Sequence, residues 1–212
     1  MIKAKASDNS KFLAPAGTFP ARCYQVIHLG TVLKKSAMYG DALKDQIRLS
    51  FELPTKTFVF SEEKGEQPYS LSQNVVLSMN SKSNLRKMVE SWDGKKMTES
   101  EAINFDFETL LGRDCLINVV HSTVGENTYA NIASISPLPE GMKCPKAVNK
   151  PVKFGFHPYD PDVFESLPQF LKDIIQTSDE WRMVMGLSPN FLNPGEEEID
   201  IDDIEFPELS TK

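Results

Sequence analysis

The sequence predicts a mainly β protein, in which five strands enclose one core and a helix separates the third strand from the fourth. Three observations lead to this fold class. Apolar and polar residues alternate along several segments, which is typical of strands with one buried face. Residues 84–92 change to a helical period. The chain of 212 residues, 40% of them hydrophobic and 25% charged, is long enough to bury a core of its own.

The first strand is predicted at residues 17–30. Strict alternation places two sets of side chains on opposite faces of this strand. One set consists of Phe19, Ala21, Cys23, Gln25, Ile27 and Leu29. The other set consists of Arg22, Tyr24, Val26 and His28. Gly30 then interrupts the strand, which indicates a strong bend that needs backbone freedom.

The second strand is predicted at residues 46–53, where Arg48 points outward. Pro54 is expected to end it, because proline has no N–H to donate to a ladder. The third extended region has two parts, residues 57–60 and 68–79, on either side of a charged turn. We expect these two parts to form a hairpin.

The helix is predicted at residues 84–92, where four apolar residues form one stripe. The stripe consists of Leu85, Met88, Val89 and Trp92. A second short helix is expected around either 100–102 or 106–111, and two more strands at 114–121 and 127–135. Three strands, a helix and two strands make up the five-stranded OB-fold barrel, although a split sandwich has the same order of elements.

Four parts follow one another along the chain. They are an N-terminal arm (1–16), an OB-fold domain (17–142), a Pro-rich connector with an amphipathic helix (143–190) and a flexible acidic tail (191–212). The helix of the connector is predicted at 162–175, where Pro168 either kinks it or begins a second helix.

Charge is distributed unevenly along the chain. Residues 196–212 contain eight Asp and Glu and one Lys, and their net charge of −7 equals that of the whole chain. A block of like charge cannot bury itself, so we expect this segment to be disordered. Residues 1–96 have 15 basic and 9 acidic residues, whereas residues 97–195 have 7 and 13. The basic first half is compatible with a polyanionic partner despite a pI of about 5.1.

Several classes of function have no support in the sequence. P-loop, dinucleotide-binding and GxSxG motifs are absent and the three histidines stand alone, so we expect no enzyme, no metal site and no cofactor. Three widely spaced cysteines predict neither disulfides nor a zinc site. No apolar run approaches the roughly 20 residues of a membrane span, and residues 1–12 do not resemble a signal peptide. We therefore expect a cytoplasmic protein without a membrane partner.

Single-stranded nucleic acid needs Lys and Arg for its phosphates and exposed aromatic rings for its bases. The candidate residues are Arg22, Tyr24, Lys34, Lys35, Tyr39, Lys44, Arg48, Tyr69, Lys82, Arg86 and Lys87. Arg22 and Tyr24 share a face of the first strand and Arg48 lies on the outer face of the second, so we expect one binding surface outside the barrel. Trp92 could add a stacking ring, but its place in the apolar stripe favours the core.

Two stretches of the sequence resemble a known family. The first joins residues 81–92, which contain Ser-Asn-Leu-Arg-Lys, to residues 105–112. The second joins residues 115–121 to residues 129–139, which begin Tyr-Ala-Asn-Ile. Together they resemble a family of phage-encoded and prophage-encoded OB-fold proteins of replication and recombination, identified as single-stranded DNA-binding proteins. The resemblance covers residues 17–142, and it implies binding of single-stranded DNA in a bacterial host cell.

The tail carries a resemblance of its own. Residues 202–209 are similar to the acidic, Phe-containing tails of bacterial and phage single-stranded DNA-binding proteins. This resemblance implies that acids in the tail meet a basic rim on replication or recombination proteins while apolar residues fill a pocket. The residues implied are Asp202, Asp203, Ile204, Glu205 and Phe206. It also implies that the tail can fold back on the basic surface and compete with DNA.

These observations favour a non-catalytic protein that binds single-stranded DNA and can also form a homo-oligomer. An alternative is an OB-fold adaptor that binds proteins through the tail and the helix at 162–175, without a nucleic-acid role. A nuclease would need a carboxylate cluster at the mouth of the barrel, which the sequence does not assemble.

Overall fold

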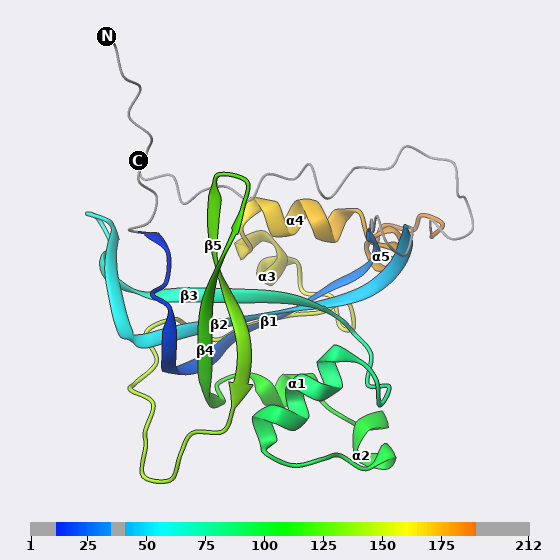
Figure 1. Cartoon of the computed structure of the whole chain (residues 1–212). Helices are drawn as coiled ribbons and strands as arrows, with labels where there is room; N and C mark the ends of the chain where they lie inside the picture. Colours follow the sequence, from blue (N-terminus) through cyan, green and yellow to red (C-terminus); the bar gives the residue numbers. More distant parts are fainter. Residues whose placement is uncertain (1–11, 35–40, 190–212) are drawn as a thin grey trace.

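The computed structural model describes residues 12–34 and 41–189, and it confirms that the protein is mainly β. Within these residues six strands form one sheet, with neighbours in the order β3, β2, β1, β4, β5 and with β6 beside β1 (Figure 1). The strands are β1 (Gly17–Lys34), β2 (Ala42–Ser61), β3 (Gly65–Val76), β4 (Asp114–Val124), β5 (Asn127–Ser136) and β6 (Val152–Phe154).

The main ladders are antiparallel, and β6 runs parallel to β1. β3 and β5 are the two ends of the strand order, and no ladder joins them in the part of the chain that the structure describes. The sheet is therefore open between these strands, and the closed barrel stays a prediction.

The predicted helix between the third and fourth strands is confirmed as α1 (Asn84–Asp93). Ser83 caps its first turn, and Gly94 ends it in the left-handed conformation, with φ of 70°. Both places proposed for a second short helix are helical, as α2 (Glu99–Ile103) and the 3₁₀ helix η2 (Phe107–Leu110). These helices fill the connection between β3 and β4.

The end of the second strand was predicted wrongly at Pro54, because β2 continues to Ser61. The ladder to β3 shifts register between Leu53 and Thr57, and the ladder to β1 has ended by Glu52. Pro54 thus lies in an irregular stretch where a backbone N–H is not needed.

The connector contains more regular structure than expected. The predicted helix is two helices, α3 (Pro161–Ser166) and α4 (Gln169–Gln176), with Pro168 just before the second. A further helix, α5 (Asp179–Val184), and the short strand β6 were not predicted. Figure 1 shows α3 and α4 on one side of the β1–β2–β3 sheet and α1 on the opposite side.

The first core lies between the sheet and α1. It contains the inward residues of β1 to β5 together with the apolar stripe of α1, including Phe51 and Leu85. Trp92 belongs to this core, with an exposed fraction of 1%, and its indole N–H donates to the Asp114 carbonyl at 2.9 Å. Trp92 therefore cannot stack on a base, and the interpretation as a core residue is confirmed.

The second core lies on the other face of the sheet, where β1 and β6 meet α3, α4 and α5. Its centre includes Phe154, Phe164 and Ile175. Gly30 belongs to the contact with α5, because a Cβ at this position would lie 2.6 Å from the Ser178 Cβ. Its φ of +84° also favours glycine.

An irregularity in β1 divides its residues between the two cores. The register with β2 shifts between Cys23 and Gln25, so one extra residue reverses the alternation. Cys23 and Val26 both face the first core, whereas Ile27 faces the second. The prediction that Gln25, Ile27 and Leu29 share a face with Cys23 is therefore wrong.

Candidate nucleic-acid interface

The outer face of β1 and β2 was predicted to bind the nucleic acid. Arg22 lies opposite Glu52 in the antiparallel ladder, and Arg48 follows Glu52 in alternation, so the three side chains share this face. Glu52 is completely buried and accepts hydrogen bonds from the backbone N–H groups of Val148 and Asn149. The connector therefore covers this part of the sheet.

Both arginines of this face bind other parts of the protein. Arg22 donates from Nε to Asp114 Oδ1 at 2.7 Å and from Nη1 to the Pro145 carbonyl at 2.9 Å. The hydrogen bond to Asp114 raises the pKa of Arg22 above its ordinary value. Arg48 donates to Asn74 at 2.9 Å and lies 5.4 Å from the centre of the Phe170 ring of α4.

Burial between α4 and the sheet lowers the pKa of Arg48. The expectation that Arg22 and Arg48 line an open binding surface is corrected by this arrangement. Both form hydrogen bonds inside the protein, and parts of the connector and α4 lie where the strand of nucleic acid was expected. The polar face continues toward β3 through hydrogen bonds from Ser72 to Ser50 and from Ser50 to Gln25.

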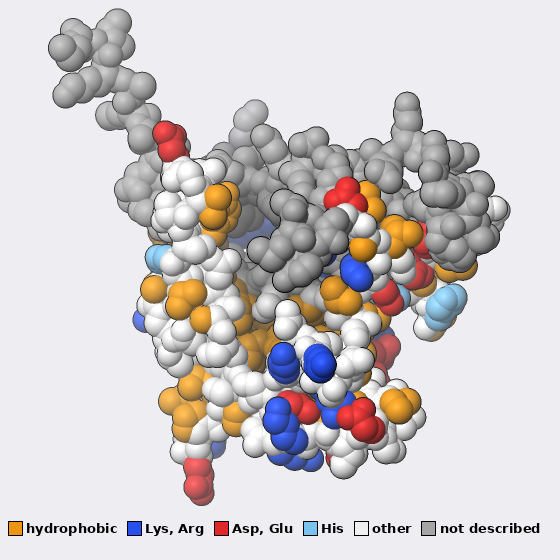
Figure 2. All heavy atoms as spheres, turned by 45° about the vertical axis from the view of Figure 1, so that its right-hand side comes forward, with side chains coloured by type: hydrophobic (Ala, Val, Ile, Leu, Met, Phe, Trp, Pro, Cys, Tyr) orange, Lys and Arg blue, Asp and Glu red, His pale blue; other side chains and the backbone are white. Residues whose placement is uncertain are grey.

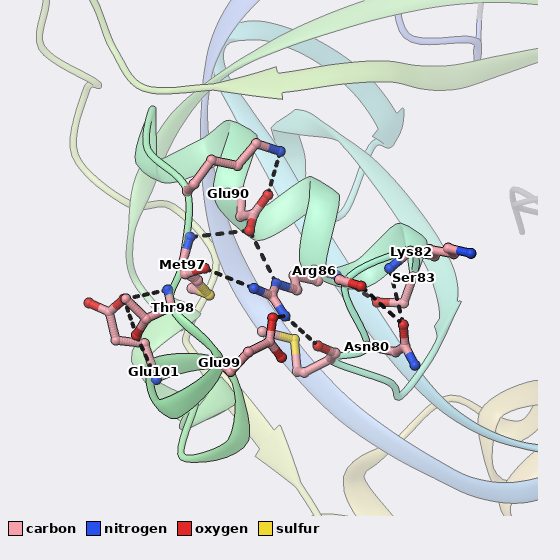
Figure 3. A network of polar contacts seen from close by, with 12 residues as sticks. Asn80, Lys82, Ser83, Arg86, Glu90, Met97, Thr98, Glu99 and Glu101 are labelled. Carbon is pink, nitrogen blue, oxygen red and sulfur yellow. Dashed lines mark hydrogen bonds and ion pairs between the residues drawn. The ribbon is translucent and has the colours of Figure 1, made fainter.

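Arg86 is a second correction, because it projects from the buried side of α1 with an exposed fraction of 4% (Figure 3). Its guanidinium donates to Glu90 Oε1 at 3.1 Å and to Glu99 Oε1 at 2.9 Å. It also donates to the carbonyls of Met97, at 2.8 Å, and Met79, at 3.3 Å. Arg86 joins three segments of the chain, and its guanidinium is buried and not presented to a phosphate.

Glu90 completes this buried network. Lys96 donates to Glu90 Oε2 at 2.7 Å, and the Met97 N–H donates to Oε1 at 3.1 Å. The bond from Lys96, the Met97 N–H and the bond from Arg86 hold the pKa of Glu90 at about 2. The carboxylate therefore remains charged and keeps the loop after α1 attached to the helix.

The predicted lysines lie in a different environment from the arginines. Lys34, Lys44, Lys82 and Lys87 are exposed. None of the four forms an ion pair with any residue that the structure describes. We call these four residues the basic edge; two come from the end of the β1–β2 ladder, and two from α1 and the segment that leads into it.

The path of the chain explains this arrangement. Lys34 and Lys44 lie at the end of the β1–β2 ladder, and the Leu77 N–H donates to the Asp45 carbonyl at 2.7 Å. This bond holds the segment after β3 beside the start of β2, and the segment then leads through Lys82 to α1. Figure 1 shows the descent from β3 to α1, and Figure 2 shows Lys and Arg side chains gathered on the lower half of this side, with some Asp and Glu among them.

The two predicted tyrosines that the structure describes are half-buried. Tyr24 interacts electrostatically with Arg48 on the covered face. Tyr69 packs edge-on against the Phe60 ring at 5.2 Å, and burial raises its pKa. The remaining predicted residues lie outside the described part of the chain. They are Lys35, Tyr39, Asp202, Asp203, Ile204, Glu205 and Phe206.

The β4–β5 hairpin presents an exposed aromatic ring that sequence reasoning did not assign to the site. Tyr129 is 48% exposed and lies opposite Ser122 in the ladder. Val120 and Val124 share its face by alternation and are also exposed. The buried residues of β4 alternate up to Val119, and extending this alternation along the sequence would have placed these side chains on the face away from the core.

A shallow hollow of about 460 Å³ lies beside α1. Its lining consists of Trp92, Asp93, Lys95, Arg113, Asp114, Pro137 and Leu138. Arg113 donates to Asp93 at 2.6 Å and stacks 4.9 Å from the centre of the Trp92 ring. These paired charges give the hollow a structural role in joining α1 to β4.

No protein-family model matches this chain, and no curated protein matches it. Among the described helices, none combines the length and the apolar character that crossing a membrane requires.

Proposed function

We propose that the protein is a non-catalytic single-stranded DNA-binding protein that contacts phosphates through the basic edge. The observation that carries this proposal is the set of four exposed lysines with no ion pair to a described residue. Free lysines release counterions when phosphates replace them, which supplies affinity without sequence preference. Tyr129 offers a ring on which a base can stack.

The strand order supports an OB-type architecture for this function. β1 pairs with both β2 and β4, while β3 and β5 form the two open edges. A partly open Greek-key barrel of five strands has this character and often binds oligonucleotides. We further propose a role in phage or prophage replication or recombination in the bacterial cytoplasm, with the acidic tail recruiting partner proteins.

A titration of labelled oligo-dT at about 50 mM and about 200 mM NaCl tests the proposal. The triple variant Lys44→Gln, Lys82→Gln and Lys87→Gln removes three charges from the basic edge. If each lysine contacts one phosphate, the slope of log K against log salt becomes shallower by about 2 in this variant. The wild type should bind measurably at the lower salt concentration.

A matched control removes the same charge from the connector through Lys143→Gln, Lys146→Gln and Lys150→Gln. These lysines are also exposed and form no ion pair with a described residue, but they lie outside the basic edge. The control should keep the wild-type slope. Equal losses in the two triple variants, or no binding by the wild type, would contradict the proposal.

A protein adaptor is the second candidate, and the exposed face of the β4–β5 hairpin favours it. Val120, Val124 and Tyr129 give this face an apolar character. The apolar side of the helices at 161–176, which the sequence offered for docking, is buried in the second core and is therefore not available. If the protein is an adaptor only, oligo-dT does not bind at either salt concentration.

A further inference from the structure

We infer that His28, Asp45 and Glu180 form a binding site for a divalent transition-metal ion, with Zn²⁺ as the best fit. The three residues come from β1, β2 and α5 and are all half-buried. One ligand atom from each lies within 4.8 Å of the other two. The inference does not rest on the proposed DNA binding.

Two carboxylates and one imidazole meet at this position. Asp45 and Glu180 bring two carboxylates together, and neither forms an ion pair with a Lys or Arg of the described chain. Among the described residues, the basic side chain in contact with them is His28, whose Nε2 lies 2.6 Å from Asp45 Oδ1. A proton on His28 balances one carboxylate and leaves the other unbalanced, whereas a divalent ion balances both.

Neighbouring residues of the fold hold two of the three ligands in place. Thr31 donates to both oxygens of Glu180, from its backbone N–H at 2.5 Å and its hydroxyl at 2.8 Å. The His28 ring packs edge-on against the Phe156 ring at 5.2 Å. Hydrogen bonds and packing of this kind orient metal ligands and strengthen their binding.

Gly30 makes the approach of Glu180 possible. A Cβ on Gly30 would lie 2.5 Å from Glu180 Oε2, so any larger residue would displace the carboxylate. The register between β1 and β2 also shifts between His28 and Gly30, so that β1 has one residue more than β2 at this point. Three segments far apart in the sequence therefore converge at one point.

The donor atoms select the class of metal. One imidazole nitrogen and two carboxylate oxygens suit Zn²⁺, which binds such ligands at about 2.0 to 2.2 Å and prefers four ligands. Three protein ligands leave one position for water. Mg²⁺ prefers oxygen ligands alone and has no use for the imidazole. A bound ion would connect α5 to the β1–β2 hairpin and so stabilise the second core.

Thermal unfolding of the tag-free full chain with ZnCl₂ and with MgCl₂ tests this inference. At free Zn²⁺ of 100 times its Kd, the Tm should rise by about 5 to 10 °C, while Mg²⁺ should not change it. Equilibrium dialysis should find one Zn²⁺ per chain. His28→Gln should abolish both effects, and Co²⁺ should give a visible absorption band in the wild type that is absent from the variant.

His121→Gln is the matched control, because His121 is exposed and its ring contacts the Ala14 carbonyl away from the cluster. This variant should keep the full response to Zn²⁺. Asp45→Asn provides a second ligand variant if His28→Gln does not fold. A wild type that does not bind Zn²⁺, or ligand variants that respond like the wild type, would overturn the inference.

Discussion

The covered face of β1 and β2 and the basic edge contain different basic residues. Arg22 and Arg48 on the covered face and Arg86 on the buried side of α1 all donate hydrogen bonds to other segments of the protein. Along the basic edge, all four residues are exposed lysines. A guanidinium presents five donors in a planar fork and loses its hydration more easily than an ammonium group does. Among the predicted binding residues that the structure describes, the arginines therefore hold the fold together and the lysines face solvent.

The largest effect is expected when a buried arginine and an exposed lysine of α1 are replaced separately and compared. Arg86→Met removes the buried partner of Glu90 and should lower the Tm by about 10 to 15 °C. Lys87→Met, the neighbouring exposed position, should change the Tm by less than about 2 °C. Thermal unfolding followed by circular dichroism measures both. Similar Tm values for the two variants would show that Arg86 does not hold the network together.

The second prediction concerns how closely α5 approaches the covered side of the sheet. Gly30→Ala should lower the free energy of unfolding by about 3 kcal/mol, because the added Cβ meets Ser178 and Glu180 at a positive φ. Gly125→Ala is the control, since φ there is +60° and nothing lies within 4 Å of the added Cβ. It should cost about 1 kcal/mol for the backbone strain alone. Urea denaturation gives both values, and equal losses would argue against a tight contact with α5.

The elements that follow a simple period could be predicted from the sequence, and the covering of the sheet could not. The apolar stripe of α1 and the β-branched, nearly continuous apolar run of β4 predict their elements from local sequence alone. The register shift after Cys23 depends on one extra residue, which leaves no mark on composition. β6 is three residues long and is stabilised by pairing with a strand more than a hundred residues away in sequence, so no local pattern predicts it.

The burial of the predicted binding residues could likewise be predicted only in part. The exposure of the basic edge agrees with the usual solvation of lysine. The burial of Arg86, in contrast, depends on acceptors such as the Met79 carbonyl and the Glu99 carboxylate, which the turns before and after α1 bring to its guanidinium. The count of basic residues in the first half therefore overstates the surface open to DNA. Likewise, a lone histidine in the sequence gave no sign of the carboxylates that surround His28.

Acid unfolding provides a third way to examine the buried network. The pKa of Glu90 is lowered to about 2, so the folded state binds the proton less readily than the unfolded state, whose pKa is about 4.5. The stability that this carboxylate contributes is therefore complete above pH 4.5 and is lost as the pH falls from 4.5 to 2. The difference in unfolding free energy between the wild type and Glu90→Gln should shrink over this range. A difference that stays constant with pH would contradict this assignment.

The smallest expected effect tests whether the basic edge is open to a second anionic ligand. Deleting residues 196–212 removes a net charge of −7 and should tighten oligo-dT binding about fivefold at low salt, or by about 1 kcal/mol. Salt screens the competition, so the gain should fade as its concentration rises. In the variant with Lys44, Lys82 and Lys87 changed to Gln, the deletion should have little effect, because tail and DNA would compete for the same lysines. Unchanged or weaker binding after deletion in the wild type would mean that the tail does not reach the basic edge.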